Sequence, residues 1–95
     1  MPWSVYLLVC DKKHFYVGMT SNLEKRMLQH KRKESFYTKQ FFEIELAYFE
    51  SYQRKSYAER REIQIKKWSR AKKKALISGD KESLIKLSKS PGLIE

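Results

Sequence analysis

The sequence predicts an α/β fold of the α+β type, with a small three-stranded mixed sheet flanked by helices in the order β-β-α-β-α-α. Three observations predict it: two short apolar and aromatic runs around a polar turn, an alternating run further on, and helix-capping patterns before the segments that follow them. A chain of 95 residues with 41% apolar residues has room for one modest core. We therefore expect a single domain with its core at about 3–78 and a helical tail at 80–95.

The first two strands are expected at 5–9 and 14–18, joined by a short polar turn. If the loop has three residues, Tyr6 lies opposite Gly18 and shares a face of the sheet with Tyr16. The missing side chain of Gly18 then leaves a gap beside the Tyr6 ring. A four-residue loop would place the two tyrosines on opposite faces, so the prediction depends on the register.

The first helix is expected to begin at Ser21, which forms a capping box with Glu24, and to end at about residue 31 or 33. Arg26 and His30 are four residues apart and lie on one side of this helix. Because the hairpin leads directly into the helix, these two residues are expected close to the two tyrosines. Each of the four suits an ordinary structural role, but together they are suited to binding a phosphate group.

The third strand is expected at 43–50, after a polar and aromatic connector at 34–42. Ile44, Leu46 and Tyr48 alternate with Glu43, Glu45 and Ala47, which predicts that the first three share one face.

Three helices are expected in the second half of the chain. Ser56 begins a second capping box, followed by a helix at 57–68. Ser69 begins a shorter basic helix that ends before Gly79, and Asp80 caps a last one.

The net charge of +10 is concentrated in the second half of the chain. Residues 1–50 carry eight Lys or Arg against six Asp or Glu, whereas residues 51–95 carry thirteen against five. Such a surface attracts polyanions, of which nucleic acid is the commonest, although a solvated helix face has the same composition. The candidate nucleic-acid contacts are Arg60, Arg61, Lys66, Lys67, Arg70, Lys72, Lys73 and Lys74.

Glu62 is the carboxylate with the most unusual predicted position. It lies on the same side of its expected helix as Ala58 and Ile65, and an inward carboxylate is costly unless it is paired or binds a metal. A salt bridge to a neighbouring Lys or Arg is one way to offset the cost of burying the Glu62 carboxylate. One carboxylate is also enough for Mg²⁺, which keeps most of its waters and takes further ligands from substrate phosphates.

Several other classes of protein are disfavoured. Cys10 is the only cysteine, and no zinc-ligand spacing or phosphate-binding glycine loop is present. There is no apolar run long enough to cross a membrane and no basic, apolar secretory leader. We therefore expect a cytoplasmic protein.

The residues singled out above resemble the GIY-YIG nuclease family. Ser4-Val5-Tyr6 matches the first tripeptide of the family and Tyr16-Val17-Gly18 matches the second. The family's helical arginine falls on Arg26, a His or Tyr one turn later falls on His30, and its metal-binding glutamate falls on Glu62. The chain is most similar to small stand-alone bacterial members, which resemble the nuclease module of the incision enzyme of excision repair.

The resemblance implies a divalent-metal-dependent endonuclease that hydrolyses DNA phosphodiester bonds, directed by structure or damage in repair or recombination. It implies that Glu62 holds Mg²⁺ or Mn²⁺ and that Tyr6 takes a proton from the attacking water. Arg26 would neutralise the phosphate, Tyr16 would position water or phosphate, and His30 would hydrogen-bond within this set.

Three departures from the family pattern leave an alternative open. Ser4 replaces glycine, and Asn22 is the only asparagine, although many members use one downstream of the glutamate. Members usually also carry a targeting domain, for which this chain has no room, so a protein partner is expected to supply targeting. The alternative is a catalytically weak or inactive nucleic-acid-binding accessory module that acts with a repair partner. A protein-interaction domain that uses the aromatic residues at 36–42 is a third possibility.

Overall fold

The computed structural model describes residues 2–35 and 38–79. The elements in chain order are β1 (Trp3–Cys10), β2 (His14–Thr20), α1 (Leu23–Lys31), the short 3₁₀ helix η1 (Thr38–Gln40), β3 (Ile44–Tyr52), α2 (Lys55–Lys66) and α3 (Arg70–Ser78). This order confirms the predicted α+β class and its β-β-α-β-α-α sequence of elements. The expected cap at Asp80 and the helical tail at 80–95 lie outside the described residues.

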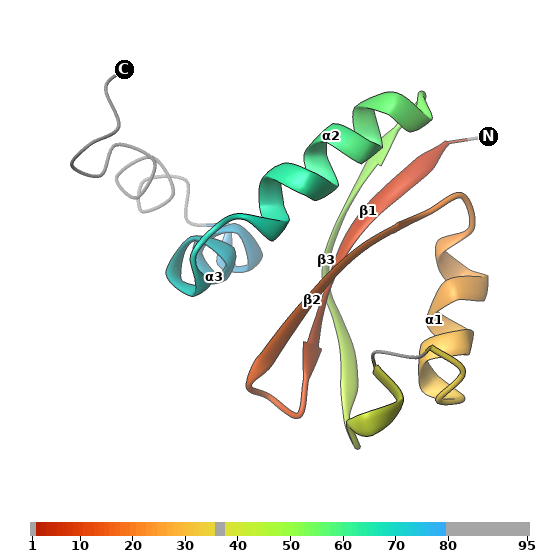
Figure 1. Ribbon diagram of the computed structural model, residues 1–95, viewed down its shortest axis with the longest axis vertical. Coiled ribbons are helices and arrows are strands. Elements are labelled where there is room, and N and C mark those ends of the chain that lie inside the picture. The colour runs from red at the N-terminus through yellow and green to blue at the C-terminus, as the bar shows by residue number, and fades with distance from the viewer. Residues whose placement is uncertain (1, 36–37, 80–95) are drawn as a thin grey trace.

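The three strands form one sheet in the order β2-β1-β3, and both neighbouring pairs are antiparallel (Figure 1). The sequence had suggested a mixed sheet, and this prediction is wrong because both strand pairs are antiparallel. The reason is the central position of β1. The hairpin makes β2 antiparallel to β1, and β3 runs in the direction of β2 but adds to the other edge of β1, so no parallel pair forms.

The hairpin has the three-residue loop that the shared face of the tyrosines requires. Cys10 is paired with His14, Leu8 with Tyr16 and Tyr6 with Gly18, as predicted. Asp11 and Lys12 in the loop have φ values of 51° and 59°. Both lie in the left-handed region, which turns the chain tightly enough to keep this register.

The pairing of β3 with β1 contains an irregularity that the alternation pattern did not predict. Leu8 is opposite Leu46 whereas Leu7 is opposite Tyr48, so an extra residue lies between the two pairs. Side chains switch faces at such a bulge. Leu46 therefore shares a face with Leu8, and Tyr48 packs on the other side. The prediction that Ile44, Leu46 and Tyr48 share one face is wrong for Tyr48.

Of the four expected helix starts, three fall within the described residues, and two of these differ in the structure. The first helix is capped by Asn22 rather than Ser21, because the Asn22 side chain accepts a hydrogen bond from the Lys25 amide at 3.0 Å. Helix α2 begins at Lys55, so Ser56 lies inside it, and its preceding residue, Arg54, makes no side-chain cap.

Helix α2 starts and ends two residues earlier than the predicted helix at 57–68. Ala58 and Ile65 of this helix are fully buried against the sheet, as their spacing in the sequence indicated. The third helix agrees with the sequence: Ser69 caps it and Gly79 ends it with a left-handed φ of 73°. No helix within 2–35 and 38–79 is long and apolar enough to cross a membrane.

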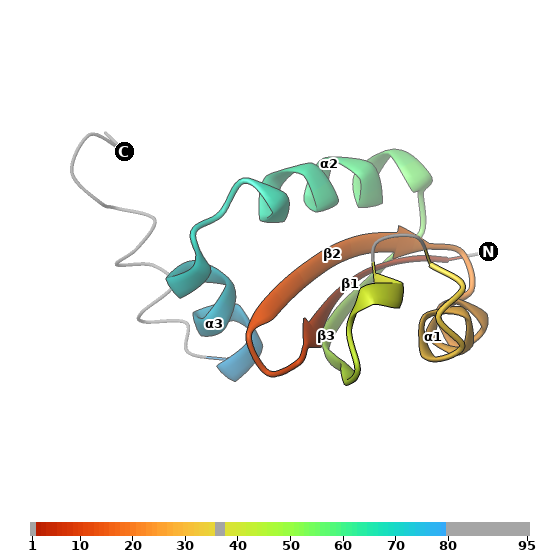
Figure 2. The same ribbon diagram turned by 60° about the horizontal axis from the view of Figure 1, so that its bottom comes forward.

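Helices α1 and α2 lie on opposite sides of the sheet (Figure 2), and each face of the sheet has a separate apolar cluster. The larger one joins α2 and α3 to the face that carries Val5, Leu7 and Val17. The smaller one joins α1 to the face that carries Tyr6, Leu8 and Cys10. Alternation along β1 therefore directs Tyr6 toward α1 and its neighbours toward α2.

Candidate active site

Tyr6 is buried on the α1 face of the sheet, 1% exposed, directly opposite Gly18. An ideal Cβ atom at Gly18 would lie 2.5 Å from the Tyr6 hydroxyl oxygen and 3.1 Å from a ring carbon of Tyr16. No side chain fits at that distance. The gap expected beside the Tyr6 ring is therefore real, and the tyrosine hydroxyl occupies it.

The hydroxyl of Tyr6 lies in a chain of hydrogen bonds that runs through His30. It is 3.0 Å from His30 Nε2, and His30 Nδ1 is 2.7 Å from Thr38 Oγ1. Arg26 Nε donates to the same tyrosine oxygen at 3.3 Å. Because Arg26 can only donate, the Tyr6 oxygen accepts the hydrogen bond from its Nε. When Tyr6 donates to Nε2, the neutral histidine carries its proton on Nδ1 and donates it to Thr38 Oγ1.

Burial sets the protonation states of this chain. It raises the pKa of Tyr6 to about 12, an effect that the Arg26 hydrogen bond only partly opposes. Burial, followed by the positive charge of Arg26, lowers the pKa of His30 to about 4. Near neutral pH the tyrosine is therefore protonated and the histidine is neutral, which agrees with the hydrogen-bond directions above.

Tyr16 completes the cluster from the edge strand β2. Its ring centroid is 6.2 Å from that of Tyr6 and 5.4 Å from that of His30. Hydrogen bonds from Arg26 to Tyr6 and, more weakly, to Tyr16 raise the pKa of the arginine. Tyr16 is only half-buried, so it is the more accessible of the two tyrosines. The structure thus brings together Tyr6, Tyr16, Arg26 and His30.

Thr38 is the member of this cluster that sequence reasoning missed, because it lies in the connector before β3. The loop between the first two strands holds this connector in place. Asp11 Oδ1 accepts hydrogen bonds from the Phe42 and Glu43 amides at 2.9 and 2.7 Å. Lys33 Nζ donates to the Phe41 carbonyl from the other side. No local pattern marks Thr38, since its partner is eight residues away in a helix.

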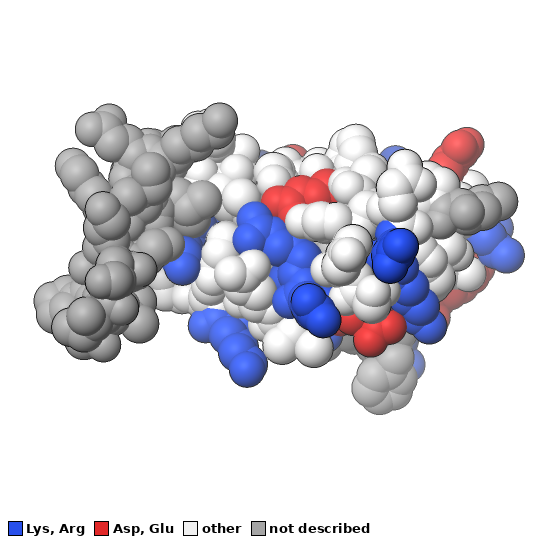
Figure 3. Space-filling model, turned by 90° about the horizontal axis from the view of Figure 1, so that it is seen from above, with Lys and Arg blue, Asp and Glu red and all other residues white. Residues whose placement is uncertain are grey.

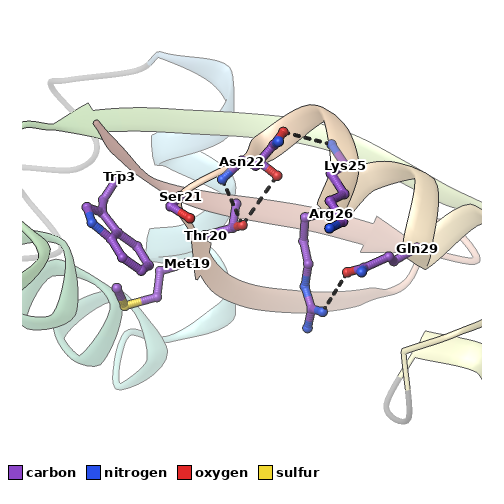
Figure 4. Close-up of a pocket in the computed structure, with 8 residues that line it drawn as sticks. All are labelled: Trp3, Met19, Thr20, Ser21, Asn22, Lys25, Arg26 and Gln29. Carbon is purple, nitrogen blue, oxygen red and sulfur yellow. Dashed lines mark hydrogen bonds between the residues drawn. The ribbon is translucent and has the colours of Figure 1, made fainter. Parts of the chain in front are cut away.

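A cavity of about 490 Å³ opens at the end of the sheet where β1 begins and β2 ends (Figure 4). Arg26 lies on its wall, and its Nη1 donates to Gln29 Oε1 at 3.0 Å, which fixes the guanidinium plane. The other lining residues are Trp3, Met19, Thr20, Ser21, Asn22, Lys25 and Gln29. The only described charges on this wall are positive, so it is suited to an anion.

Glu62 lies on α2, over the opposite face of the sheet from the tyrosines. Its side chain is 18% exposed and its carboxylate is 3.6 Å from Lys66 Nζ. This is the ion pair that the sequence allowed as the simpler interpretation. Within the described residues, no hydrogen bond or ion pair joins Glu62 to the four clustered residues, and no group of three or more potential metal ligands exists.

Arg61 stands apart from the other candidate nucleic-acid contacts. Its Nε and Nη2 atoms donate to the two carboxylate oxygens of Glu50, each at 2.9 Å. Tyr48 and Tyr52 donate to the same carboxylate. Although burial alone would raise the pKa of Glu50, these hydrogen bonds hold it below its usual value. Arg61 therefore already has a partner inside the protein.

The remaining basic residues are more available to a partner. Arg60, Lys66, Lys67, Arg70 and Lys74 are exposed, whereas Lys72 and Lys73 are half-buried. Lys72 Nζ lies 4.3 Å from the centre of the Trp68 ring, and Arg70 is 4.7 Å from that of Phe15. Figure 3 shows Lys and Arg side chains spread across one face of the molecule, with a few acidic groups between them.

The three-stranded antiparallel sheet, its helices and the clustered Tyr, Arg and His side chains make up a small α+β domain with an anion-compatible site. Comparison with known proteins assigns this domain to a family. The model of the GIY-YIG catalytic domain matches residues 2–75, so the chain belongs to the GIY-YIG family. Membership indicates endonuclease activity and implies DNA as the substrate.

Within this family, the chain is similar to small stand-alone proteins named UPF0213. The one from Natronomonas pharaonis is 39% identical over 77 residues, which cover 80% of this chain and 91% of the relative. The one from Syntrophus aciditrophicus is 39% identical over 82 residues, covering 84% and 94%. A solution NMR structure of a UPF0213 protein from Bacillus halodurans has a TM-score of 0.49 at 26% identity, covering 98% of this chain and 92% of that one.

Proposed function

We propose that this protein is a divalent-metal-dependent endonuclease that hydrolyses phosphodiester bonds in DNA, acting on branched or damaged structures in repair or recombination. The observation that carries the proposal is the buried hydrogen-bond chain from Arg26 through Tyr6 to His30, beside an anion-compatible cavity. A buried tyrosine, a neutral histidine and a fixed guanidinium are a costly combination for a core. The free-energy cost of burying these polar groups is offset in function if they orient Arg26 and Tyr16 toward a phosphate.

Arg26 is the residue best suited to bind the scissile phosphate. Its guanidinium is held from two sides, by the Tyr6 hydroxyl and by Gln29 Oε1, and it lines the cavity. A charge fixed before the substrate arrives needs no reorganisation when negative charge builds up on the phosphate. Its role is to stabilise the pentavalent transition state.

Tyr16 is the tyrosine that contacts the attacking water or the phosphate. The family resemblance gave proton transfer to Tyr6, but the pKa shifts argue for a supporting role. Burial raises the pKa of Tyr6 to about 12 and lowers that of His30 to about 4, so Tyr6 holds its proton near neutral pH and His30 is a poor acceptor for it. Tyr6 and His30 therefore position Arg26 and Tyr16, and Tyr16 is the more exposed hydroxyl.

Glu62 would hold Mg²⁺ or Mn²⁺. Its donor set fits such an ion, since the carboxylate is partly exposed and its one ion-pair partner is a lysine at 3.6 Å. Mg²⁺ binds through one or two carboxylates, several waters and the phosphates of the substrate. Glu62 lies over the other face of the sheet from Arg26 and does not line the cavity, so the ion would act on DNA that reaches both α2 and the end of the sheet. When bound, it would polarise a phosphate there and offset charge on the leaving oxygen.

The exposed basic residues of α2 and α3 would bind the DNA backbone without reading its sequence. Arg60, Lys67 and Lys74 are the best candidates because they are exposed, whereas the exposed Lys66 pairs with Glu62 and the exposed Arg70 lies over the Phe15 ring. Arg61 contributes to this surface only indirectly, through its ion pair with Glu50.

A second candidate function is a nucleic-acid-binding accessory module with weak or no catalysis, which acts with a repair partner. The observation that favours it is the position of Glu62, paired with Lys66 and without a contact to the tyrosine cluster. In that case the basic surface would remain functional while the metal site would not.

Cleavage of a labelled panel of single-stranded, duplex, flapped and four-way DNA, with Mg²⁺ or Mn²⁺, tests the proposal. The variants are Glu62→Gln, which removes the charge at constant size, and Glu59→Gln, the same change at an exposed position of the same helix. We expect metal-dependent cleavage that is lost in Glu62→Gln and retained in Glu59→Gln, with similar DNA affinity in both. Tight binding without cleavage of any substrate would favour the accessory module.

A further inference from the structure

The cavity at the end of the sheet has two unlike halves. Figure 4 shows Trp3 and Met19 on one side of the turn that leads into α1, and Arg26 and Gln29 on the other. Trp3 and Met19 belong to the face of the sheet that packs against α2, whereas Arg26 contacts Tyr6 on the α1 face. The cavity thus passes around the sheet end and joins an apolar wall to a cationic one.

This combination is suited to a nucleotide rather than to a bare phosphate. A phosphate alone needs only the cationic half, and an apolar ligand needs only the other. The cavity volume of about 490 Å³ is that of a small-molecule site. A flat aromatic surface beside a fixed guanidinium matches a base and its phosphate, because every base has a π face that stacks on an aromatic ring.

Trp3 differs from the residues that form the adjacent core. Val5 and Leu7, the next residues on the same face, are each 1% exposed, whereas Trp3 is only half-buried and lines the cavity. Lys55 Nζ lies 5.2 Å from the centre of its ring, which adds a second positive charge near the apolar half. A tryptophan that only filled the core would not need to border a charged cavity.

We propose that Trp3 and Met19 form the surface on which the base next to the scissile phosphate stacks, while Arg26 binds that phosphate. Trp3 is then a substrate-contacting residue that binds any nucleotide whose base is free to stack. This inference rests on the proposed nuclease function and adds a requirement for an accessible base at the cleavage position.

Tryptophan fluorescence tests the contact directly, because Trp3 and Trp68 are the only tryptophans. The Trp68→Phe variant leaves Trp3 as the only indole, with the ring at position 68 preserved for its cationic neighbours. The probe is a short DNA oligonucleotide with a dye at one end, so that anisotropy reports binding independently. We expect saturable quenching of Trp3 at the DNA concentration that gives binding.

A series of oligonucleotides of the same sequence, each with an abasic site at a different position, locates the stacked base. An abasic site next to the cleaved bond should abolish quenching and weaken binding about 5- to 100-fold. Abasic sites at the other positions should leave both quenching and binding unchanged. Binding and cleavage without any change in Trp3 fluorescence would overturn this inference and leave the nuclease intact. Absence of both binding and cleavage would overturn the nuclease proposal and this inference with it.

Two substitutions of Trp3 provide a second readout in the otherwise unchanged protein. Trp3→Tyr retains a ring that can stack, and Trp3→Leu retains apolar bulk without one. We expect KM to rise about tenfold in Trp3→Leu, with little change in kcat, and to be close to that of the original protein in Trp3→Tyr. Equal effects of the two variants, or an effect on thermal stability alone, would show that Trp3 is only a core residue.

Discussion

The hydroxyl oxygen of Tyr6 lies only 2.5 Å from the ideal position of a Cβ atom at Gly18, which is too close for any side chain at that residue. The tyrosine of one strand and the glycine of the next are therefore parts of one packing arrangement. This arrangement keeps Tyr6 within reach of both Arg26 and His30. The glycine is needed for space and not for a special backbone conformation, since it is not among the residues of positive φ.

Gly18→Ala is expected to destabilise the protein by about 1–3 kcal/mol, because the new methyl group overlaps the Tyr6 ring. Urea unfolding gives the free energy directly. The double variant with Tyr6→Phe removes the closest atom but leaves the ring carbon at 2.6 Å, so only part of the loss should be recovered. A Gly18→Ala protein as stable as the original would contradict the described packing.

The stability of the protein is expected to fall as the pH is lowered through the range from about 6.5 to about 4. In this range unfolded His30 becomes protonated, whereas folded His30, with a pKa of about 4, stays neutral. The unfolded state therefore binds more protons, and stability is full above 6.5 and lost as the pH falls toward 4. Urea unfolding at a series of pH values measures this slope.

The control for this pH dependence is His30→Gln, which can keep hydrogen bonds to Tyr6 and Thr38 but cannot titrate. The difference in unfolding free energy between the two proteins should change across that pH range, while carboxylate titrations cancel. Parallel pH profiles would mean that His30 is not held neutral by the fold.

Arg61 and Lys67 are expected to behave differently although both lie in the basic segment. Arg61→Gln breaks the ion pair with Glu50 and should cost about 1–3 kcal/mol, less than a fully buried pair because both groups are partly exposed. Lys67→Gln should leave stability unchanged and lower the salt dependence of DNA binding by about one unit of slope. Thermal unfolding and binding at several salt concentrations separate these effects, and the reverse pattern would contradict the assignment.

The sequence was sufficient for features that depend on neighbours along the chain. The hairpin register follows from a three-residue loop, and Ser69 and Gly79 bound a helix by local chemistry. The choice between Ser21 and Asn22 as a cap, however, depends on how the chain leaves β2, where the Thr20 hydroxyl accepts a hydrogen bond from the Asn22 amide at 3.1 Å. The capping pattern of the sequence cannot distinguish two adjacent residues that can both cap a helix.

The parts of the site that the sequence missed depend on tertiary contacts. Thr38 meets His30 only because Asp11 holds the connector before β3. The irregularity near Leu46 moves Tyr48 to the other face, where it reaches Glu50, and periodicity cannot reveal a bulge. The four clustered residues were predictable because a hairpin and the helix after it leave little freedom in their relative position.

The most direct test of the account is the cleavage rate of Tyr16→Phe under single-turnover conditions, with DNA affinity and unfolding free energy measured on the same sample. Only one hydroxyl is removed, and the half-buried ring keeps its contacts with Tyr6 and His30. We predict a rate at least 100-fold lower, with affinity and stability nearly unchanged, as expected for a group that acts on the attacking water. Cleavage within a few-fold of the original rate would contradict the assignment of this cluster as the active site.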